Sequence, residues 1–169
     1  MERAFRKRGI NFSTGVRFAG VDKTKHGVVA KLEDGQTFAA DLMLVAVGRG
    51  SATRNQGFEE AGLEFDGELI KVNENLQTNL ANVYAVGDIV RGPQLAHKGF
   101  QEGIFVAEHI KGLNPRVIDI TAIPRVTYSE PEVASVGLNE SAAKEKYGAD
   151  QLRTVQYDLA GNGKSQILR

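Results

Sequence analysis

Hydrophobic and polar positions along the chain divide it into short segments separated by glycine-rich turns. Residues 27–32 and 36–40 are two such segments, and they flank the dipeptide Asp34-Gly35. This dipeptide suits the positive backbone angles of a tight hairpin turn. The two segments are therefore predicted to pair as an antiparallel ribbon.

Two runs of mostly apolar residues predict strands of a different kind. Residues 42–47 and 82–86 are each followed directly by a glycine. A continuous apolar run of this length is typical of a strand that is buried on both faces. Residues 69–72 predict a weaker strand. Together these strands indicate an α/β fold with a layered body.

One long helix is predicted from about residue 95 to residue 111, where Gly112 stops it. Along this helix Gly99, Gly103 and Ala107 are four residues apart and therefore share one face. A face of such small residues indicates that another group approaches it closely. Tight packing within the protein and a bound ligand both explain this pattern.

The sequence changes character after residue 115, and we place a domain boundary near residue 118. Asn139 is a suitable N-cap for a helix over residues 140–147, which Gly148 would close. Strands are predicted over residues 124–128, 133–138 and 152–157. A helix beside antiparallel strands indicates an α+β unit.

Both ends of the sequence have the pattern of interrupted elements. Residues 1–10 are typical of the last turns of a helix that ends at Gly9. Residues 166–169 begin an apolar run and predict part of a strand. We therefore expect this chain to be an internal piece of a longer protein.

Composition and charge narrow the classes of function. The 169 residues include 21 Lys and Arg and 21 Asp and Glu, so no net charge attracts nucleic acid. No apolar run is long enough for a membrane span, and no apolar segment follows the basic start. We expect a cytoplasmic protein that binds neither nucleic acid nor membrane. The chain has no cysteine, which excludes a disulfide, a thiolate metal site and a cysteine nucleophile within it.

The candidate chemistry centres on Gly87-Asp88, which follows the predicted strand over residues 82–86. In open α/β sheets, ligands bind beyond the carboxyl ends of the strands, where a carboxylate can accept hydrogen bonds from sugar or ribitol hydroxyls. Asp88 occupies such a position. From these residues alone, a role in closing a turn explains Asp88 equally well.

The surrounding sequence favours the ligand-binding role. Residues 78–88 closely resemble the second flavin-binding motif of the pyridine nucleotide-disulfide oxidoreductases, in which the aspartate binds the flavin ribitol. Residues 95–99 with Glu102-Gly103 are similar to the dihydrolipoyl dehydrogenase branch of that family. There, backbone amides at a helix N-terminus meet the pyrimidine edge of the flavin, where reduced flavin gathers negative charge. With Asp88, the resemblance implies these FAD contacts: Gln94, Leu95, Ala96 and His97.

A second cofactor is implied by residues 45–49, which resemble the strand end where the NAD-binding domain returns to the flavin domain. The resemblance implies that Gly48 allows close approach of NAD, although a plain exit from a strand also explains this glycine. In the family pattern Glu102 faces the same region, and we expect it near the nicotinamide. His97 is expected to contact flavin mainly through its backbone.

The resemblance extends over essentially the whole chain and implies three domain parts. Residues 1–50 would end the NAD-binding domain, and residues 51–117 would form the C-terminal part of the FAD-binding domain. Residues 118–169 would begin an α+β interface domain, because residues 123–137 are similar to its opening in the family. That domain implies a homodimer.

The function implied for the full-length protein is oxidation of protein-bound dihydrolipoamide, with electrons passing through a disulfide and FAD to NAD. Its partners would be the lipoyl domains of 2-oxo acid dehydrogenase complexes. The family also needs an N-terminal Gly-x-Gly-x-x-Gly turn, a second Gly-rich turn and a cysteine pair, and none of these occurs here. It needs a His-Glu pair near its C-terminus as well, in a region that we expect to lie beyond Arg169. We therefore assign no catalytic residue and no metal ligand, and expect the chain alone neither to retain flavin nor to turn over dihydrolipoamide.

Two alternatives remain open on the sequence. The chain could belong to a related flavin disulfide reductase that acts on glutathione, mycothione or mercury. Such a reductase would share Gly87-Asp88 but differ around residues 95–102. The chain could also be a catalytically silent module that acts only in dimerisation or binding.

Overall fold

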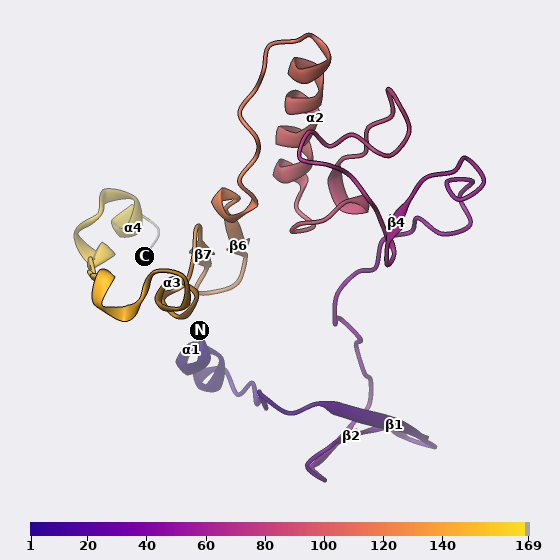
Figure 1. The fold of residues 1–169 in the computed structure, drawn as a ribbon. Helices are drawn as coiled ribbons and strands as arrows, with labels where there is room; N and C mark the ends of the chain where they lie inside the picture. Colours follow the sequence, from indigo (N-terminus) through magenta and orange to yellow (C-terminus); the bar gives the residue numbers. More distant parts are fainter. Residues whose placement is uncertain (168–169) are drawn as a thin grey trace. The chain divides into compact units, whose positions relative to one another are not determined.

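The computed structural model describes residues 1–167 and shows a mixed α/β chain. It divides into two compact units, one of residues 1–120 with 126–133, the other of residues 121–125 with the chain from Ala134 onward. The helices are α1 (Glu2–Lys7), α2 (Ala96–Ile110), α3 (Glu140–Tyr147) and α4 (Gly163–Ile167) (Figure 1). The strands are β1 (Phe18–Thr24), β2 (Gly27–Leu32), β3 (Thr37–Ala40), β4 (Phe65–Asp66), β5 (Leu69–Ile70), β6 (Arg125–Thr127) and β7 (Val133–Ser135).

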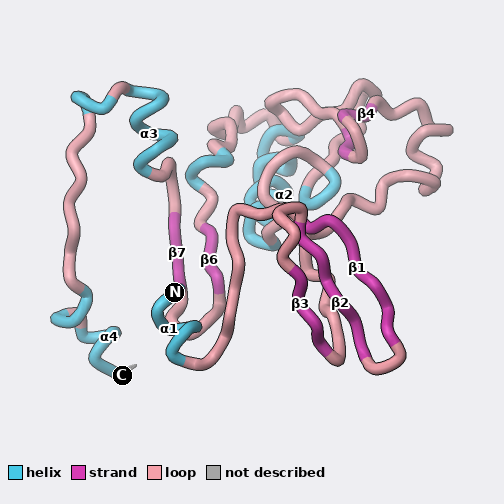
Figure 2. Tube along the Cα trace, turned by 90° about the horizontal axis from the view of Figure 1, so that it is seen from below, coloured by secondary structure: helices cyan, strands magenta, loops and turns pink. Residues whose placement is uncertain are grey.

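The first sheet is antiparallel, with the strand order β1-β2-β3 (Figure 2). The predicted hairpin is confirmed, since β2 pairs with β3 and Gly35 lies in the turn with φ of +87°. Strand β1 was not predicted. Gly27 starts β2 where a Cβ atom would lie 2.2 Å from the carbonyl oxygen of Ala40, so only glycine fits this approach.

The apolar run at residues 42–47 does not form the predicted buried strand. It is irregular and exposed, with Leu44 at 88% and Val47 at 93% of their full accessibility. A strand needs neighbours that accept its backbone hydrogen bonds and cover its apolar side chains. No neighbouring strand within residues 1–167 pairs with this run, which explains why the prediction was wrong.

Three further strand predictions are also corrected. Residues 82–86 make only an isolated bridge between Gln77 and Tyr84, although Ala85 is buried. Residues 152–157 are irregular for the same reason as the run at 42–47, because no described strand pairs with them. The predicted strand at residues 166–169 is also absent from the described residues, because Gln166 and Ile167 lie in helix α4. Residues 168–169 are outside the described part of the chain.

The weaker strand and the first two of the three predicted interface strands are confirmed in shorter form. Strand β5 pairs with β4 as a two-residue ladder, and β6 and β7 make a two-stranded sheet. The hydrophobic core of the first unit is built around β5 and the segment that follows Tyr84. Its buried residues are Ile70, Ala85 and Val90. Partly buried side chains pack against them: Phe58, Leu63, Phe65, Val72 and Ile89.

The ends of α1 and α2 follow the glycine rule used to predict them. Gly9 and Gly112 both have positive φ, at +76° and +77°. The Gly112 N–H donates to the carbonyl of His109 and the next N–H donates to the carbonyl of Glu108, which forms a Schellman motif. The same pattern closes α1, so the predicted ends of both helices are confirmed.

Helix α3 has the predicted bounds and the predicted cap. The side chain of Asn139 accepts a hydrogen bond from the Ala142 N–H at 2.8 Å, and Gly148 ends the helix with φ of +86°. A hydrogen bond from Lys144 to Glu140, 2.5 Å long, lowers the pKa of the Glu140 carboxyl. The sequence of this short helix thus carries its own start and stop signals.

Replacing Asn139 with alanine is expected to destabilise α3 by about 1 kcal/mol, because the Ala142 N–H loses its acceptor. Amide hydrogen exchange of Ala142 and Ala143 measures this, and both amides should exchange faster. Asn139→Asp keeps a side-chain acceptor and serves as the control. Equal exchange in Asn139→Ala and the wild type would show that the cap does not stabilise the helix.

Candidate functional site

Gly87 and Asp88 lie in a single 3₁₀ turn, η1 (Gly87–Ile89), that packs against helix α2. Gly87 has φ of +78°, a conformation that favours glycine. Ala85 before the turn and Val90 after it both belong to the hydrophobic core. The turn is therefore anchored on both sides.

Two charged side chains of α2 hold the backbone of Gly87. Lys98 and Glu102 are 1% and 2% exposed and form an ion pair with 2.9 Å between Lys98 Nζ and Glu102 Oε1. Lys98 Nζ also donates to the Gly87 carbonyl at 2.8 Å, and the Gly87 N–H donates to Glu102 Oε2 at 2.6 Å. We call Lys98 and Glu102 the clamp pair.

Two glycines lie where the loop around the turn meets helix α2. A Cβ atom on Gly99 would lie 3.5 Å from the Cα of Gly87, and one on Gly92 would lie 2.5 Å from Lys98 Cε. The expected close approach to the small-residue face of α2 is thus confirmed at Gly99, where the neighbour is backbone of the chain itself. At Gly103 the space is open.

The carboxylate of Asp88 is on the surface of this anchored turn. Asp88 is exposed, and its backbone carbonyl accepts a hydrogen bond from Ser51 Oγ at 2.6 Å. Within residues 1–167 no hydrogen bond or ion pair engages its side chain. The carboxylate is therefore available to hydroxyl groups of a ligand.

The other expected flavin contacts lie at the start of α2. Leu95 is the N-cap residue and is half-buried, while the expected contacts Gln94, Ala96 and His97 are exposed. No side chain caps this helix end. Because η1 packs against Lys98 and Gly99, the structure brings Asp88 and the beginning of α2 to one region of the first unit. That these residues bind flavin stays a prediction.

Gly48, the expected NAD contact, lies in the exposed segment that follows the sheet. Its φ is +132°, a conformation that favours glycine, and no group would obstruct a Cβ atom there. Ser51, three residues later, reaches the Asp88 backbone. The contact of Gly48 with NAD stays a prediction.

The role of the clamp pair was not predicted from the sequence. That Glu102 lies near the nicotinamide stays a prediction. Both of its carboxylate oxygens are engaged within the protein, one by Lys98 and one by Gly87. The available signal was the spacing of a lysine and a glutamate four residues apart, which places them on one face of a helix. On most helices that spacing marks an exposed pair, as in Glu140 and Lys144 of α3.

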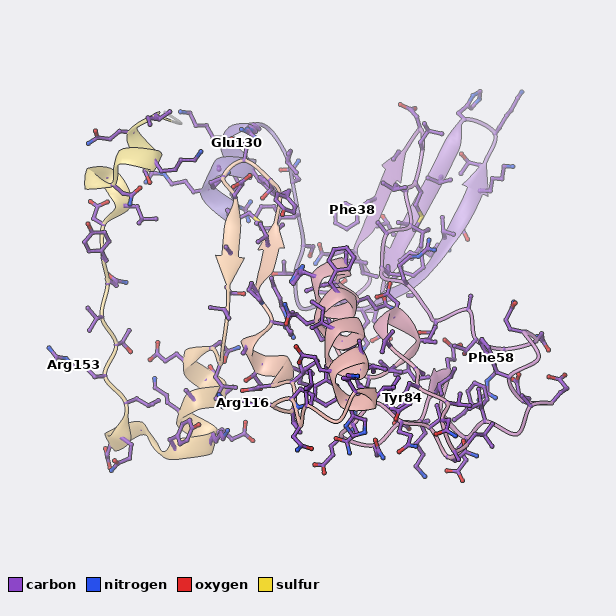
Figure 3. All side chains as sticks on the ribbon, turned by 90° about the horizontal axis from the view of Figure 1, so that it is seen from above. Phe38, Phe58, Tyr84, Arg116, Glu130 and Arg153 are labelled. Carbon is purple, nitrogen blue, oxygen red and sulfur yellow. The ribbon has the colours of Figure 1, made fainter. Side chains whose placement is uncertain are left out.

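Aromatic packing holds the far end of α2 to the chain before the turn. The rings of Phe105 and His109 are stacked, with centroids 6.2 Å apart and planes at 6°. Tyr84 meets His109 edge-on at 6.0 Å and lies beside α2 (Figure 3). Tyr84 precedes Gly87 by three residues, so this contact also fixes the entry to the turn.

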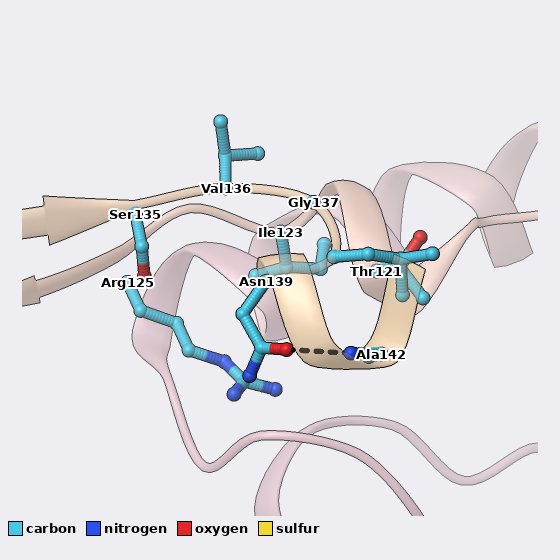
Figure 4. Close-up of a pocket in the computed structure, with 9 residues that line it drawn as sticks. Thr121, Ile123, Arg125, Ser135, Val136, Gly137, Asn139 and Ala142 are labelled. Carbon is cyan, nitrogen blue, oxygen red and sulfur yellow. Dashed lines mark hydrogen bonds between the residues drawn. The ribbon is translucent and has the colours of Figure 1, made fainter. Parts of the chain in front are cut away.

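Each unit also contains a cavity. In the first unit, a cavity of about 270 Å³ is lined by Val72, Asn73, Glu74, Leu76, Arg91, Glu102, Phe105, Val117, Ile118 and Ile120. In the second unit, a cavity of about 210 Å³ lies between the cap of α3 and strand β7, and Figure 4 shows its lining with the Asn139 hydrogen bond. The Asn139 side chain faces this second cavity, but its Oδ1 atom accepts the capping hydrogen bond from the Ala142 N–H.

Two classes of site find no support in the part of the chain that the structure describes. Residues 1–167 contain no group of three His, Cys, Asp or Glu side chains arranged to hold a metal ion. Over the same residues, no helix has both the length and the apolar character needed to cross a membrane.

Comparison with known proteins identifies the class to which this fold and turn belong. Residues 1–103 match the family described as pyridine nucleotide-disulphide oxidoreductase. Residues 123–169 match the dimerisation domain of the same family. The chain therefore belongs to the pyridine nucleotide-disulphide oxidoreductase family, and the resemblance stated from the sequence is confirmed.

Within this family the chain is similar to dihydrolipoyl dehydrogenases. It is 39% identical to one from Bacillus subtilis over 98% of the chain and 36% of that protein. It is 34% identical to the human mitochondrial dihydrolipoyl dehydrogenase over 98% of the chain and 33% of that protein. The chain thus spans about a third of the length of these relatives.

Solved structures show the same fold. The structure of LpdA from Mycobacterium tuberculosis matches with a TM-score of 0.83 and 25% identity, over 99% of this chain and 36% of that one. The flavoprotein disulfide reductase RclA from Escherichia coli matches with a TM-score of 0.82 and 23% identity, over 99% of this chain and 38% of that one.

Proposed function

We propose that this chain forms the flavin-ribitol turn and part of the interface domain of a dihydrolipoyl dehydrogenase. The observation that carries the proposal is the anchored Gly87-Asp88 turn, packed against the first turns of α2 with the Asp88 carboxylate exposed. The similarity to dihydrolipoyl dehydrogenases over 98% of the chain supports the same assignment.

The residues present fit an FAD group. The Asp88 carboxylate would accept hydrogen bonds from ribitol hydroxyls, and these charged-acceptor bonds are stronger than neutral ones. The start of α2 at residues 94–97 and the positive end of the α2 dipole would stabilise negative charge on the flavin ring. When bound, FAD supplies the electron transfer between the disulfide centre and NAD, and the protein supplies orientation and electrostatics.

The whole reaction belongs to a longer protein in this proposal. The chain has no cysteine, so the dithiol-disulfide step that oxidises dihydrolipoamide cannot take place on its residues. We propose residues 1–50 as NAD-domain sequence carrying the NAD contact Gly48, residues 51–117 as FAD-domain sequence, and residues 118–169 as interface-domain sequence. The match to the dimerisation domain supports a homodimer. Lipoyl domains are the proposed partners and the cytoplasm the proposed location.

A chimeric enzyme tests this function. The segment of the Bacillus subtilis dihydrolipoyl dehydrogenase that aligns with this chain is replaced by residues 1–169. We expect the purified chimera to be yellow with bound FAD and to reduce NAD with dihydrolipoamide. Flavin absorbance and NADH formation measure the two properties.

The comparison substrates decide between the alternatives. Activity with glutathione disulfide or mycothione in place of dihydrolipoamide would transfer the assignment to another flavin disulfide reductase. A folded, dimeric chimera that binds no FAD would refute the flavin role. The isolated chain is expected to retain no flavin, because most of the FAD-binding sequence of the family is absent from it.

A further inference from the structure

Burial of the clamp pair contributes little to the stability of a helix, because charged groups are unfavourable in the protein interior. Removing a lysine and a glutamate from water has a large desolvation cost. Their mutual attraction offsets this cost only when further hydrogen bonds satisfy both charged groups. Replacing such a pair with apolar side chains of similar volume is often neutral for stability or even favourable. The burial of Lys98 and Glu102 therefore calls for a role besides global stability.

The additional hydrogen bonds of the pair all go to one residue. Lys98 holds the carbonyl of Gly87 and Glu102 holds its N–H, so both backbone groups of a single glycine are bound by opposite charges. Such a double hold fixes the orientation of the two peptide planes around Gly87. The direction in which the next residue, Asp88, leaves the turn is fixed with them.

Lys98 also constrains the exit from the turn. Its side-chain stem passes Gly92 so closely that a Cβ atom there would lie 2.5 Å from Lys98 Cε. Gly92 has φ of +127°, a conformation open mainly to glycine. One buried lysine thus contacts the loop on both sides of Asp88, at Gly87 and at Gly92.

We propose that Lys98 and Glu102 are positioning residues that hold Asp88 in the orientation needed for its ligand before the ligand arrives. This inference rests on the proposed flavin function for the identity of the ligand, but not for the ordering of the turn. The pair acts through the Gly87 backbone and does not touch the ligand. Its effect is preorganisation, because a turn already ordered loses less entropy on binding.

The test compares single and double replacements in the full chain. Lys98→Met and Glu102→Leu each leave one buried charge without its partner, and both should lower the unfolding midpoint. The double variant removes both charges, and its midpoint should return toward that of the wild type. The amides of Gly87 and Asp88 should nevertheless exchange about tenfold faster than in the wild type, as expected when a local hydrogen-bonded turn opens.

An exposed pair with the same spacing provides the control. Glu140 and Lys144 on α3 are both about half exposed. The double replacement Glu140→Leu with Lys144→Met makes the same chemical change on the surface. It should leave the Gly87 and Asp88 amides unaffected, because it is in the other unit.

Recovery of both stability and slow exchange in the clamp double variant would overturn the proposal, since the pair would then be only core packing. If the double variant does not fold, Glu102→Gln decides. It keeps an acceptor for the Gly87 N–H but removes the charge. We expect faster exchange of Gly87 while the amides of α2 stay protected, and unchanged Gly87 exchange would contradict the proposal.

The effect of the clamp pair on FAD binding is measured in the chimeric enzyme. The clamp double variant should raise the Kd for FAD about tenfold, because binding must then order the turn. Failure of the unmodified chimera to bind FAD would count against the proposed function alone, since amide exchange in the ligand-free chain still tests the ordering. An unchanged Kd in a double variant with a disordered turn would show that ordering of Asp88 does not serve flavin.

Discussion

Replacing Phe105 with alanine is expected to lower the free energy of unfolding of the first unit by about 3 kcal/mol or more. Phe105 is only 4% exposed and stacks on His109. The substitution removes a buried ring and enlarges the cavity that Phe105 already lines. Urea unfolding followed by far-UV circular dichroism measures the loss as a lower midpoint.

Phe100→Ala is the matched control, because Phe100 lies on the same helix and is 71% exposed. The same change of side chain should there alter stability by no more than about 0.5 kcal/mol. Equal effects at the two positions would show that burial of Phe105 does not anchor α2. In Phe105→Ala the Gly87 amide should also exchange faster, since α2 carries the clamp pair.

The helices could be predicted from the sequence because their signals are local. Asn139 and Gly148 set the bounds of α3 through one side-chain hydrogen bond and one positive φ. Gly112 ends α2 by a Schellman motif that involves only neighbouring residues. Such signals act within a few residues, so they need no knowledge of the rest of the fold.

The buried strands could not be predicted in the same way because a strand depends on partners. The apolar content of residues 42–47 indicates a preference for burial but does not supply a neighbouring strand. In the described chain this run stays irregular and exposed. The hairpin of β2 and β3 succeeded because its partner follows directly after the turn at Gly35.

The candidate site shows the same division. Asp88 and the start of α2 could be found from a contiguous motif, and the structure places η1 against that helix. The clamp pair could not be recognised, because its role depends on contact between Gly87 and residues 11 and 15 positions later. In sequence, a lysine and a glutamate four apart look like an ordinary surface pair.

Replacing Asp88 with alanine in the chimeric enzyme is expected to raise the Kd for FAD by about 10- to 100-fold, the usual effect of losing hydrogen bonds to a charged group. The carboxylate is exposed and lies in a turn whose backbone is held by α2, so its removal should not unfold the protein. Flavin released on dilution, followed by fluorescence, measures the change.

Asp88→Asn keeps an acceptor oxygen without the charge, so its loss of affinity should be smaller than that of Asp88→Ala. The exposed Asp150 of the second unit provides a matched control, and Asp150→Ala should bind FAD as the unmodified chimera does. Enzyme that is saturated with FAD should keep its KM for NAD, because Asp88 is assigned to the ribitol and not to the dinucleotide. Wild-type affinity for FAD in Asp88→Ala would instead show that this carboxylate only closes the turn. That role explains the dipeptide Gly87-Asp88 equally well when it is considered without the surrounding sequence.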